Sequence, residues 1–144
     1  MQSEPLSKIL LVDDDRVTNM LHERLIGKSG VARSVAVATD GVAALEHLES
    51  VRSADEEAPD LILLDINMPR MNGFEFLEAY RDLPSEEQKR HMIVMLSTSV
   101  LQRDHARAEA DPNVHAFVSK PLDRALLNDI VAACQAGRSD RAAG

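Results

Sequence analysis

Carboxylate, hydroxyl and ammonium side chains follow short apolar runs at several places in this sequence. They are Asp13, Asp14 and Asp15 after the first run, Asp65 after a later one, and Ser97 and Lys120 after two more. Carboxylates coordinate hard divalent cations, while a hydroxyl and an ammonium can hold phosphoryl oxygens. If the fold brings these groups together, they could support metal-dependent phosphoryl transfer.

The charges of these groups favour a metal ion. Asp13, Asp14 and Asp65 would place three negative charges close together, and Lys120 compensates one of them. Like charges at short range repel unless a cation neutralises them, and Mg²⁺ is commonly held by one or two carboxylates together with waters and phosphate oxygens. We therefore predict a Mg²⁺ site. Asp65 is the best candidate nucleophile, because it stands alone at a strand end and Asp can form an aspartyl-phosphate. Ser97 and Lys120 would then bind phosphoryl oxygens.

Five continuous apolar runs predict the strands that position these residues. They span residues 9–12, 35–38, 61–64, 92–96 and 116–118. Continuous rather than alternating apolar runs are typical of parallel strands covered on both faces. The segments between them have helical spacing, so strands and helices alternate five times.

The five predicted helices have recognisable ends. Apolar residues at 17, 20, 21 and 25 mark the first helix, which Gly27 would close, and Thr39 or Asp40 would cap the second. Asn72-Gly73 would open the third, which stops near Pro84. The fourth spans about 102–110, and the fifth follows Pro121 or is capped by Asp123. For Asp15, the prediction is a helix N-cap rather than a metal ligand.

This alternation predicts an open, doubly wound α/β fold with five helices. Periodicity alone does not fix a strand order, and the order that we expect for the five-stranded parallel sheet is the flavodoxin-like 2-1-3-4-5. One domain would span residues 8–134, between an N-terminal extension at 1–7 and a disordered tail at 135–144. Residues 49–59 and 84–91 are predicted surface loops. In such sheets the ligand site lies at the carboxyl ends of the strands, where the residues named above are found.

Composition limits the possible partners. The 144 residues include 16 basic and 24 acidic side chains, for a net charge of −8, and no basic run typical of nucleic-acid binding. No apolar run approaches the length of about 20 residues that spans a membrane, and the N-terminus lacks a signal-peptide pattern. We therefore expect a cytoplasmic protein that binds neither nucleic acid nor membrane.

Four sequence blocks carry a family resemblance. "ILLVDDD", "LILLDINMPRMNG", "IVMLSTS" and "AFVSKP" resemble, in order and spacing, the receiver domains of two-component response regulators over about residues 8–134. The resemblance implies that Asp65 accepts a phosphoryl group and that Asp13, Asp14 and the backbone carbonyl of Asn67 join it in binding Mg²⁺.

The resemblance also implies residues that respond to phosphorylation. The switch residues of the family would be Ser97, where Thr is commoner, and Phe117. Lys120 would be the family's lysine, with a cis peptide before Pro121. Asn67 and Ser99 would tune dephosphorylation.

The resemblance also implies partners. A histidine kinase or histidine phosphotransfer protein would supply the phosphoryl group, and a downstream protein of unknown identity would read it. With no output domain in the sequence, the chain resembles a stand-alone, chemotaxis-type regulator, expected to be a monomer or weak homodimer. It would catalyse only its own phosphorylation and slow dephosphorylation.

Two other functions remain open at this point. A phosphohydrolase of the haloacid dehalogenase type also places a nucleophilic Asp after a strand, but Asn67 stands where that class usually has a second Asp. A binding module that kept the fold and lost the chemistry is the other alternative. The presence of Asp13, Asp14, Asp65, Ser97 and Lys120 argues against it.

Overall fold

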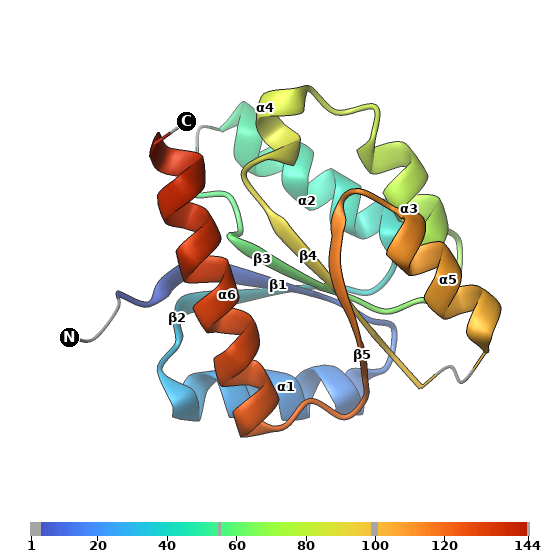
Figure 1. Ribbon diagram of the computed structural model, residues 1–144, viewed down its shortest axis with the longest axis horizontal. Coiled ribbons are helices and arrows are strands. Elements are labelled where there is room, and N and C mark those ends of the chain that lie inside the picture. Colours follow the sequence, from blue (N-terminus) through green and yellow to red (C-terminus); the bar gives the residue numbers. More distant parts are fainter. Residues whose placement is uncertain (1–3, 55, 99–100, 144) are drawn as a thin grey trace.

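A five-stranded parallel sheet lies between two layers of helices (Figure 1) in the computed structural model, which describes residues 4–54, 56–98 and 101–143. The strands are β1 (Leu6–Val12), β2 (Ala32–Ala38), β3 (Leu61–Leu64), β4 (Met92–Ser97) and β5 (Val114–Ser119). Their order is β2-β1-β3-β4-β5, and every neighbouring pair is parallel. The predicted flavodoxin-like fold and strand order are confirmed.

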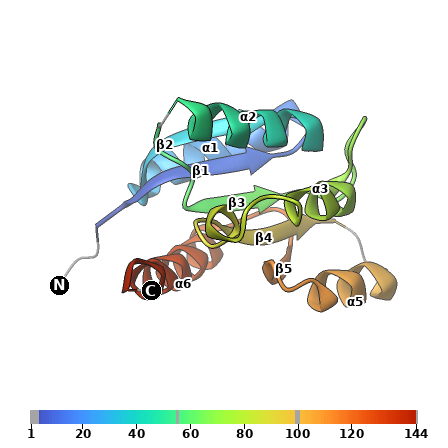
Figure 2. The same ribbon diagram turned by 90° about the horizontal axis from the view of Figure 1, so that it is seen from above.

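The helices cover both faces of the sheet (Figure 2). They are α1 (Arg16–Ser29), α2 (Gly41–Ser53), α3 (Gly73–Tyr80), α4 (Ser85–Gln88), α5 (Gln102–Ala110) and α6 (Arg124–Ala143). α1 and α6 pack on one face around residues such as Ile9 and Leu63, while α2, α3 and α5 pack on the other around Leu10 and Ile62. Successive strand residues therefore enter opposite cores, which is why these runs are apolar without alternation.

Side-chain caps set the start of several helices. Asp40 accepts a hydrogen bond from the Ala43 amide at the start of α2, and Asp123 accepts one from the Leu126 amide at the start of α6. Asn72 forms a reciprocal capping box with Glu75 in α3. These contacts satisfy amide groups that a helix cannot pair internally, and they agree with the predicted helix starts.

Several predicted boundaries differ from the structure. Gly27 does not close α1, which continues to Ser29 and is capped by Gly30 at φ 64°, a left-handed conformation that glycine adopts readily. A short sixth helix, α4, lies within the predicted loop at 84–91. β1 begins at Leu6, inside the predicted extension, and α6 continues to Ala143 through the segment expected to be disordered.

The exposed face of α1 also differs from the prediction. Val17, Met20 and Leu21 are 59%, 51% and 50% exposed, although their spacing suggested the buried face of the helix. Asn19 and His22 are buried instead. Helical spacing of apolar residues identified the helix correctly but not the side that faces the sheet, because α1 has apolar residues on more than one side.

Substituting Gly73 with Ala is expected to destabilise the protein by about 1–3 kcal/mol through overpacking. A Cβ atom at this position would collide with the backbone oxygen of Asp65 and lie 3.1 Å from the Ile66 Cα. Urea unfolding measures the effect. Gly27→Ala is the matched control: nothing lies within 4 Å of its added Cβ, so this helix-interior change should stabilise by about 0.5–1 kcal/mol. Equal effects of the two substitutions would contradict the packing argument.

Candidate functional site

The turn between β1 and α1 holds the first carboxylates in place. The Asp13 amide donates to the Ala38 carbonyl at 3.0 Å, and the buried Asn19 side chain donates to the Asp13 carbonyl at 2.8 Å. Asp15 caps α1 by accepting a hydrogen bond from the Thr18 hydroxyl at 2.9 Å and others from backbone amides, which lower the pKa of its carboxyl group. The N-cap prediction for Asp15 is therefore confirmed, and its carboxylate accepts hydrogen bonds from the first turn of α1.

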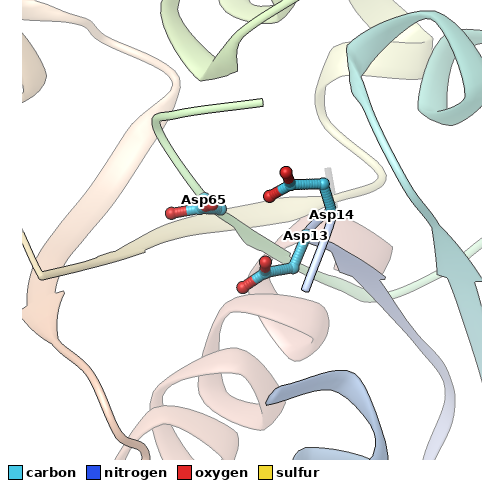
Figure 3. Close-up of side chains that lie close together, drawn as sticks. All are labelled: Asp13, Asp14 and Asp65. Carbon is cyan, nitrogen blue, oxygen red and sulfur yellow. The ribbon is translucent and has the colours of Figure 1, made fainter. Parts of the chain in front are cut away.

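The end of β3 brings Asp65 to the same edge of the sheet. Its amide donates to the Val12 carbonyl at 2.9 Å, which sets Asp65 beside the acidic turn. Asp13, Asp14 and Asp65 each offer a carboxylate oxygen, and these oxygens lie within 4.8 Å of one another (Figure 3). Asp13 and Asp65 are buried, whereas Asp14 is exposed. The three predicted metal-binding carboxylates thus meet in one cluster.

Lys120 connects this cluster to the end of β5. Its ammonium lies 2.5 Å from an Asp13 oxygen and 3.1 Å from an Asp65 oxygen. Its backbone amide donates to the Ser97 carbonyl at 3.0 Å, and the Lys120–Pro121 peptide is cis, as the family resemblance implied. The side chain of Lys120 therefore reaches both buried carboxylates from a strand two positions away from β3 in the sheet.

Electrostatics at the cluster favour an added cation. Burial and the charge of Asp13 raise the pKa of Asp65, and the interaction with Lys120 offsets this only in part. Burial alone would lower the pKa of Lys120, but its hydrogen bond to Asp13 and the charge of Asp65 outweigh that effect and raise it. Lys120 is therefore charged at neutral pH, yet it balances only one of three carboxylates. The oxygen-only donor set with excess negative charge fits Mg²⁺.

The predicted switch residues Ser97 and Phe117 lie on β4 and β5. Ser97 ends β4, is 1% exposed and pairs in register with Ser119 of β5. Phe117 lies half-buried on β5, where its ring is 4.0 Å from the His105 ring of α5. Asn67 is exposed in the loop after Asp65. Ser99, the other residue expected to tune dephosphorylation, lies outside the described residues.

The structure adds an ion pair that sequence reasoning missed. Arg70, in the loop between β3 and α3, donates to both carboxylate oxygens of Asp40 at 2.7 and 3.1 Å. Burial alone would raise the pKa of Asp40, but the hydrogen bonds from Arg70 and from the Ala43 amide outweigh it and lower that pKa. The capping pattern identified Asp40, but no local pattern links it to a residue 30 positions away.

Comparisons with known proteins agree with this geometry. Residues 9–132 match the response regulator receiver domain family. Chemotaxis protein CheY of Pseudomonas aeruginosa is 31% identical, covering 85% of this chain and 90% of its own length. Response regulator Rcp1 of Synechocystis sp. is 30% identical over 83% of this chain and 80% of its own length. A two-component response regulator from Cytophaga hutchinsonii has a crystal structure with a TM-score of 0.83 at 32% identity, covering 90% of this chain and 97% of its own.

The fold, the acidic cluster and these matches define the class, and the chain belongs to the response regulator receiver domain family. It is a CheY-like receiver domain of two-component signalling, a signalling domain rather than an enzyme. Receiver domains bind a divalent metal at an acidic cluster and interact with histidine kinases or phosphotransfer proteins and with downstream targets. Across the part of the chain that the structure describes, no helix is long and apolar enough to cross a membrane.

Asp65→Asn is expected to raise the free energy of unfolding in metal-free buffer at neutral pH by on the order of 1 kcal/mol, because burial and the charge of Asp13 disfavour the ionised Asp65 carboxylate more than Lys120 favours it. Since the native state raises the pKa of Asp65, native stability falls as pH rises from the ordinary carboxyl range through that raised value. The gain should therefore vanish below about pH 4. Chemical denaturation of both proteins across this pH range measures it. A less stable variant at neutral pH would contradict the electrostatic argument.

Proposed function

We propose that this chain is a single-domain response regulator of a two-component or phosphorelay system. A histidine kinase or histidine phosphotransfer protein would transfer a phosphoryl group to Asp65 in a Mg²⁺-dependent reaction. The observation that carries this proposal is the Lys120 ammonium, which contacts Asp13 and Asp65 at the carboxylate cluster. An acceptor carboxylate beside a cation and further acidic ligands is the arrangement that phosphoryl transfer requires.

Each side chain has a role in the proposed transfer. An Asp65 oxygen forms the new bond to phosphorus while the bond from phosphorus to the donor imidazole breaks. Lys120 and Ser97 would each hold a phosphoryl oxygen. Mg²⁺ held by Asp13, Asp14, Asp65 and the Asn67 carbonyl would neutralise charge on the phosphoryl oxygens. The solved Mn²⁺-bound form of response regulator Rcp1, with a TM-score of 0.69 at 26% identity over 90% of each chain, supports a divalent metal in such a fold.

Phosphorylation would change the surface formed by α5, β5 and α6. The added oxygens would draw Ser97 toward Asp65 and would bind Lys120, which already contacts Asp65 at 3.1 Å. Phe117 would turn inward. Because the Phe117 ring contacts His105 of α5, a change in the Phe117 rotamer would alter the packing of that helix. A target protein that binds the phosphorylated surface more tightly would shift the population toward that state. Slow autodephosphorylation would end the signal.

The exposed apolar face of α1 is the proposed docking surface for the phosphoryl donor. Val17, Met20 and Leu21 are each at least half exposed. Beside them, a cavity of about 430 Å³ is lined by residues that include Leu21, His22, Lys120 and Pro121. A helical donor that buried this surface would bring its phosphohistidine to the edge where Asp65 lies.

The regulator would act in the cytoplasm as a monomer or weak homodimer. Its output would be a contact with another protein, because the net charge of −8 disfavours nucleic acid.

Intact-protein mass spectrometry after incubation with acetyl phosphate tests the proposal. We expect a gain of one phosphoryl group that requires Mg²⁺ and is lost with EDTA. Borohydride reduction, which converts an aspartyl-phosphate to homoserine, should mark the peptide containing Asp65. If no adduct forms under rapid trapping, the protein is a phosphorylation-independent binding module. Continuous release of phosphate from phosphate esters would instead indicate a hydrolase.

A further inference from the structure

The loop between β3 and α3, residues 65–72, is held at both ends by close backbone contacts. The Gly73 amide donates to the Ile66 carbonyl at 2.8 Å, and the Gly41 amide at the start of α2 donates to the Met71 carbonyl at 2.9 Å. Gly41 approaches so closely that a Cβ atom there would lie 2.6 Å from the Met71 Cγ. The loop is therefore packed against the start of α2, next to the carboxylate cluster.

Arg70 lies in the middle of this loop with an unusual backbone. Its φ is 61°, in the left-handed region that L residues other than Asn and Asp seldom adopt. Its side chain is 60% exposed, whereas the side chain of Asp40, which it contacts, is 5% exposed. An arginine with a left-handed backbone conformation is strained, so contacts with the surrounding structure must stabilise that conformation. The two-point hydrogen bond from the Arg70 guanidinium to Asp40 is such a contact.

We propose that the Asp40–Arg70 ion pair is a positioning element for the metal site. By fixing the loop to the start of α2, it holds the backbone carbonyl of Asn67 where a metal bound by Asp13, Asp14 and Asp65 requires it. Asp40 and Arg70 do not touch the metal or the phosphoryl group. They act through the conformation of residues 66–71. This inference rests on the proposed function, because it concerns the same Mg²⁺ site.

Two substitutions each remove the charge of one partner of the ion pair. Asp40→Asn keeps a good cap for α2, because Asn serves as well as Asp at that position. Arg70→Met removes the guanidinium from an exposed side chain. Loss of nearby charge alone would weaken Mg²⁺ binding in Asp40→Asn and strengthen it in Arg70→Met. Loss of positioning weakens Mg²⁺ binding in both variants. The two explanations therefore predict opposite changes in the Mg²⁺ affinity of Arg70→Met.

Isothermal titration of the full chain with Mg²⁺ tests the inference. We expect each variant to bind Mg²⁺ about tenfold more weakly than the native chain, as is typical when supporting contacts around a metal site are lost. The double variant should bind no more weakly than the single ones. Tighter binding by Arg70→Met, or unchanged binding by both variants, would overturn the proposal.

Asp111→Asn is the matched control. Asp111 is also a buried carboxylate paired with an exposed arginine, Arg81 at 2.5 Å, and it also accepts a backbone amide, from Asn113 at 2.8 Å. It precedes the amino end of β5, away from the carboxylate cluster at the carboxyl ends of the strands. This variant should bind Mg²⁺ as the native chain does. An equal loss in Asp111→Asn would show that the effect is one of general stability and would overturn the positioning role.

Hydrogen exchange without metal separates this inference from the proposed function. In metal-free buffer the amides of Gly41 and Gly73 should exchange faster in Asp40→Asn and Arg70→Met than in the native chain, because the loop has lost its anchor. Native-like exchange of both amides in both variants would overturn the positioning role, whatever the titration shows. If the native chain itself binds no Mg²⁺ and takes up no phosphoryl group, the proposed function fails, and the exchange result still decides whether the pair holds the loop.

Discussion

Asp65→Asn is expected to take up no phosphoryl group from acetyl phosphate under conditions in which the native chain is fully modified. The amide oxygen of Asn is a poor nucleophile and cannot form the acyl phosphate. Neither neighbouring carboxylate is expected to replace Asp65 as the acceptor. Asp14 is exposed, and Asp13 makes the shorter contact with Lys120, 2.5 Å against 3.1 Å for Asp65. Intact-protein mass with and without Mg²⁺ measures the loss.

Asp111→Asn is the control for this prediction, because it replaces a buried, ion-paired carboxylate in the same way at a distance from the cluster. It should accept the phosphoryl group at the native rate. An adduct of unchanged yield in Asp65→Asn would place the acceptor elsewhere and would remove the basis of the proposed switch.

Lys120→Met is expected to slow phosphoryl uptake about 100-fold, in the range seen when one preorganised group that stabilises transition-state charge is removed. Met keeps much of the apolar stem of Lys120 but lacks the ammonium that contacts Asp13 and Asp65. Mg²⁺ binding should become tighter in the same variant, because the three carboxylates lose the cation that partly neutralises them. Adduct formation over time and Mg²⁺ titration measure the two effects.

Opposite changes in rate and metal affinity distinguish this prediction from simple unfolding, which would weaken both. Lys120→Arg provides the comparison that keeps the charge, although a planar guanidinium differs in shape and reach from an ammonium. We expect it to retain the native Mg²⁺ affinity more closely than Lys120→Met does. A native rate of phosphoryl uptake in Lys120→Met would refute the role assigned to Lys120.

Local sequence patterns predicted much of the fold because the relevant interactions are short-range or repeat regularly. The continuous apolar runs of β1, β3 and β4 reflect burial on both faces of the sheet, as the structure confirms. Capping residues such as Asp15 and Asp123 act on amides within three positions of themselves, so their roles can be read from nearby residues.

The carboxylate cluster was predictable for a different reason. In a parallel α/β sheet every strand ends at the same edge, so residues that follow the strands must meet there. Asp13, Asp65 and Lys120 could be assigned to one site from their positions after three strands. Their contacts, however, join residues as far as 107 positions apart, and no local pattern specifies which oxygens the lysine reaches.

Tertiary structure decided the features that depend on how elements face one another. α1 buries Asn19 and His22 and exposes Val17 and Met20, because the packing of the helix on the sheet, rather than its apolar spacing, selects the inward side. The Asp40–Arg70 pair arises because the loop after β3 packs on the start of α2. The alternation of strands and helices, several helix starts and the acidic edge thus follow from the amino-acid sequence through local and repeating interactions. The inward side of α1 and the anchoring of the metal-site loop arise only when distant segments pack together.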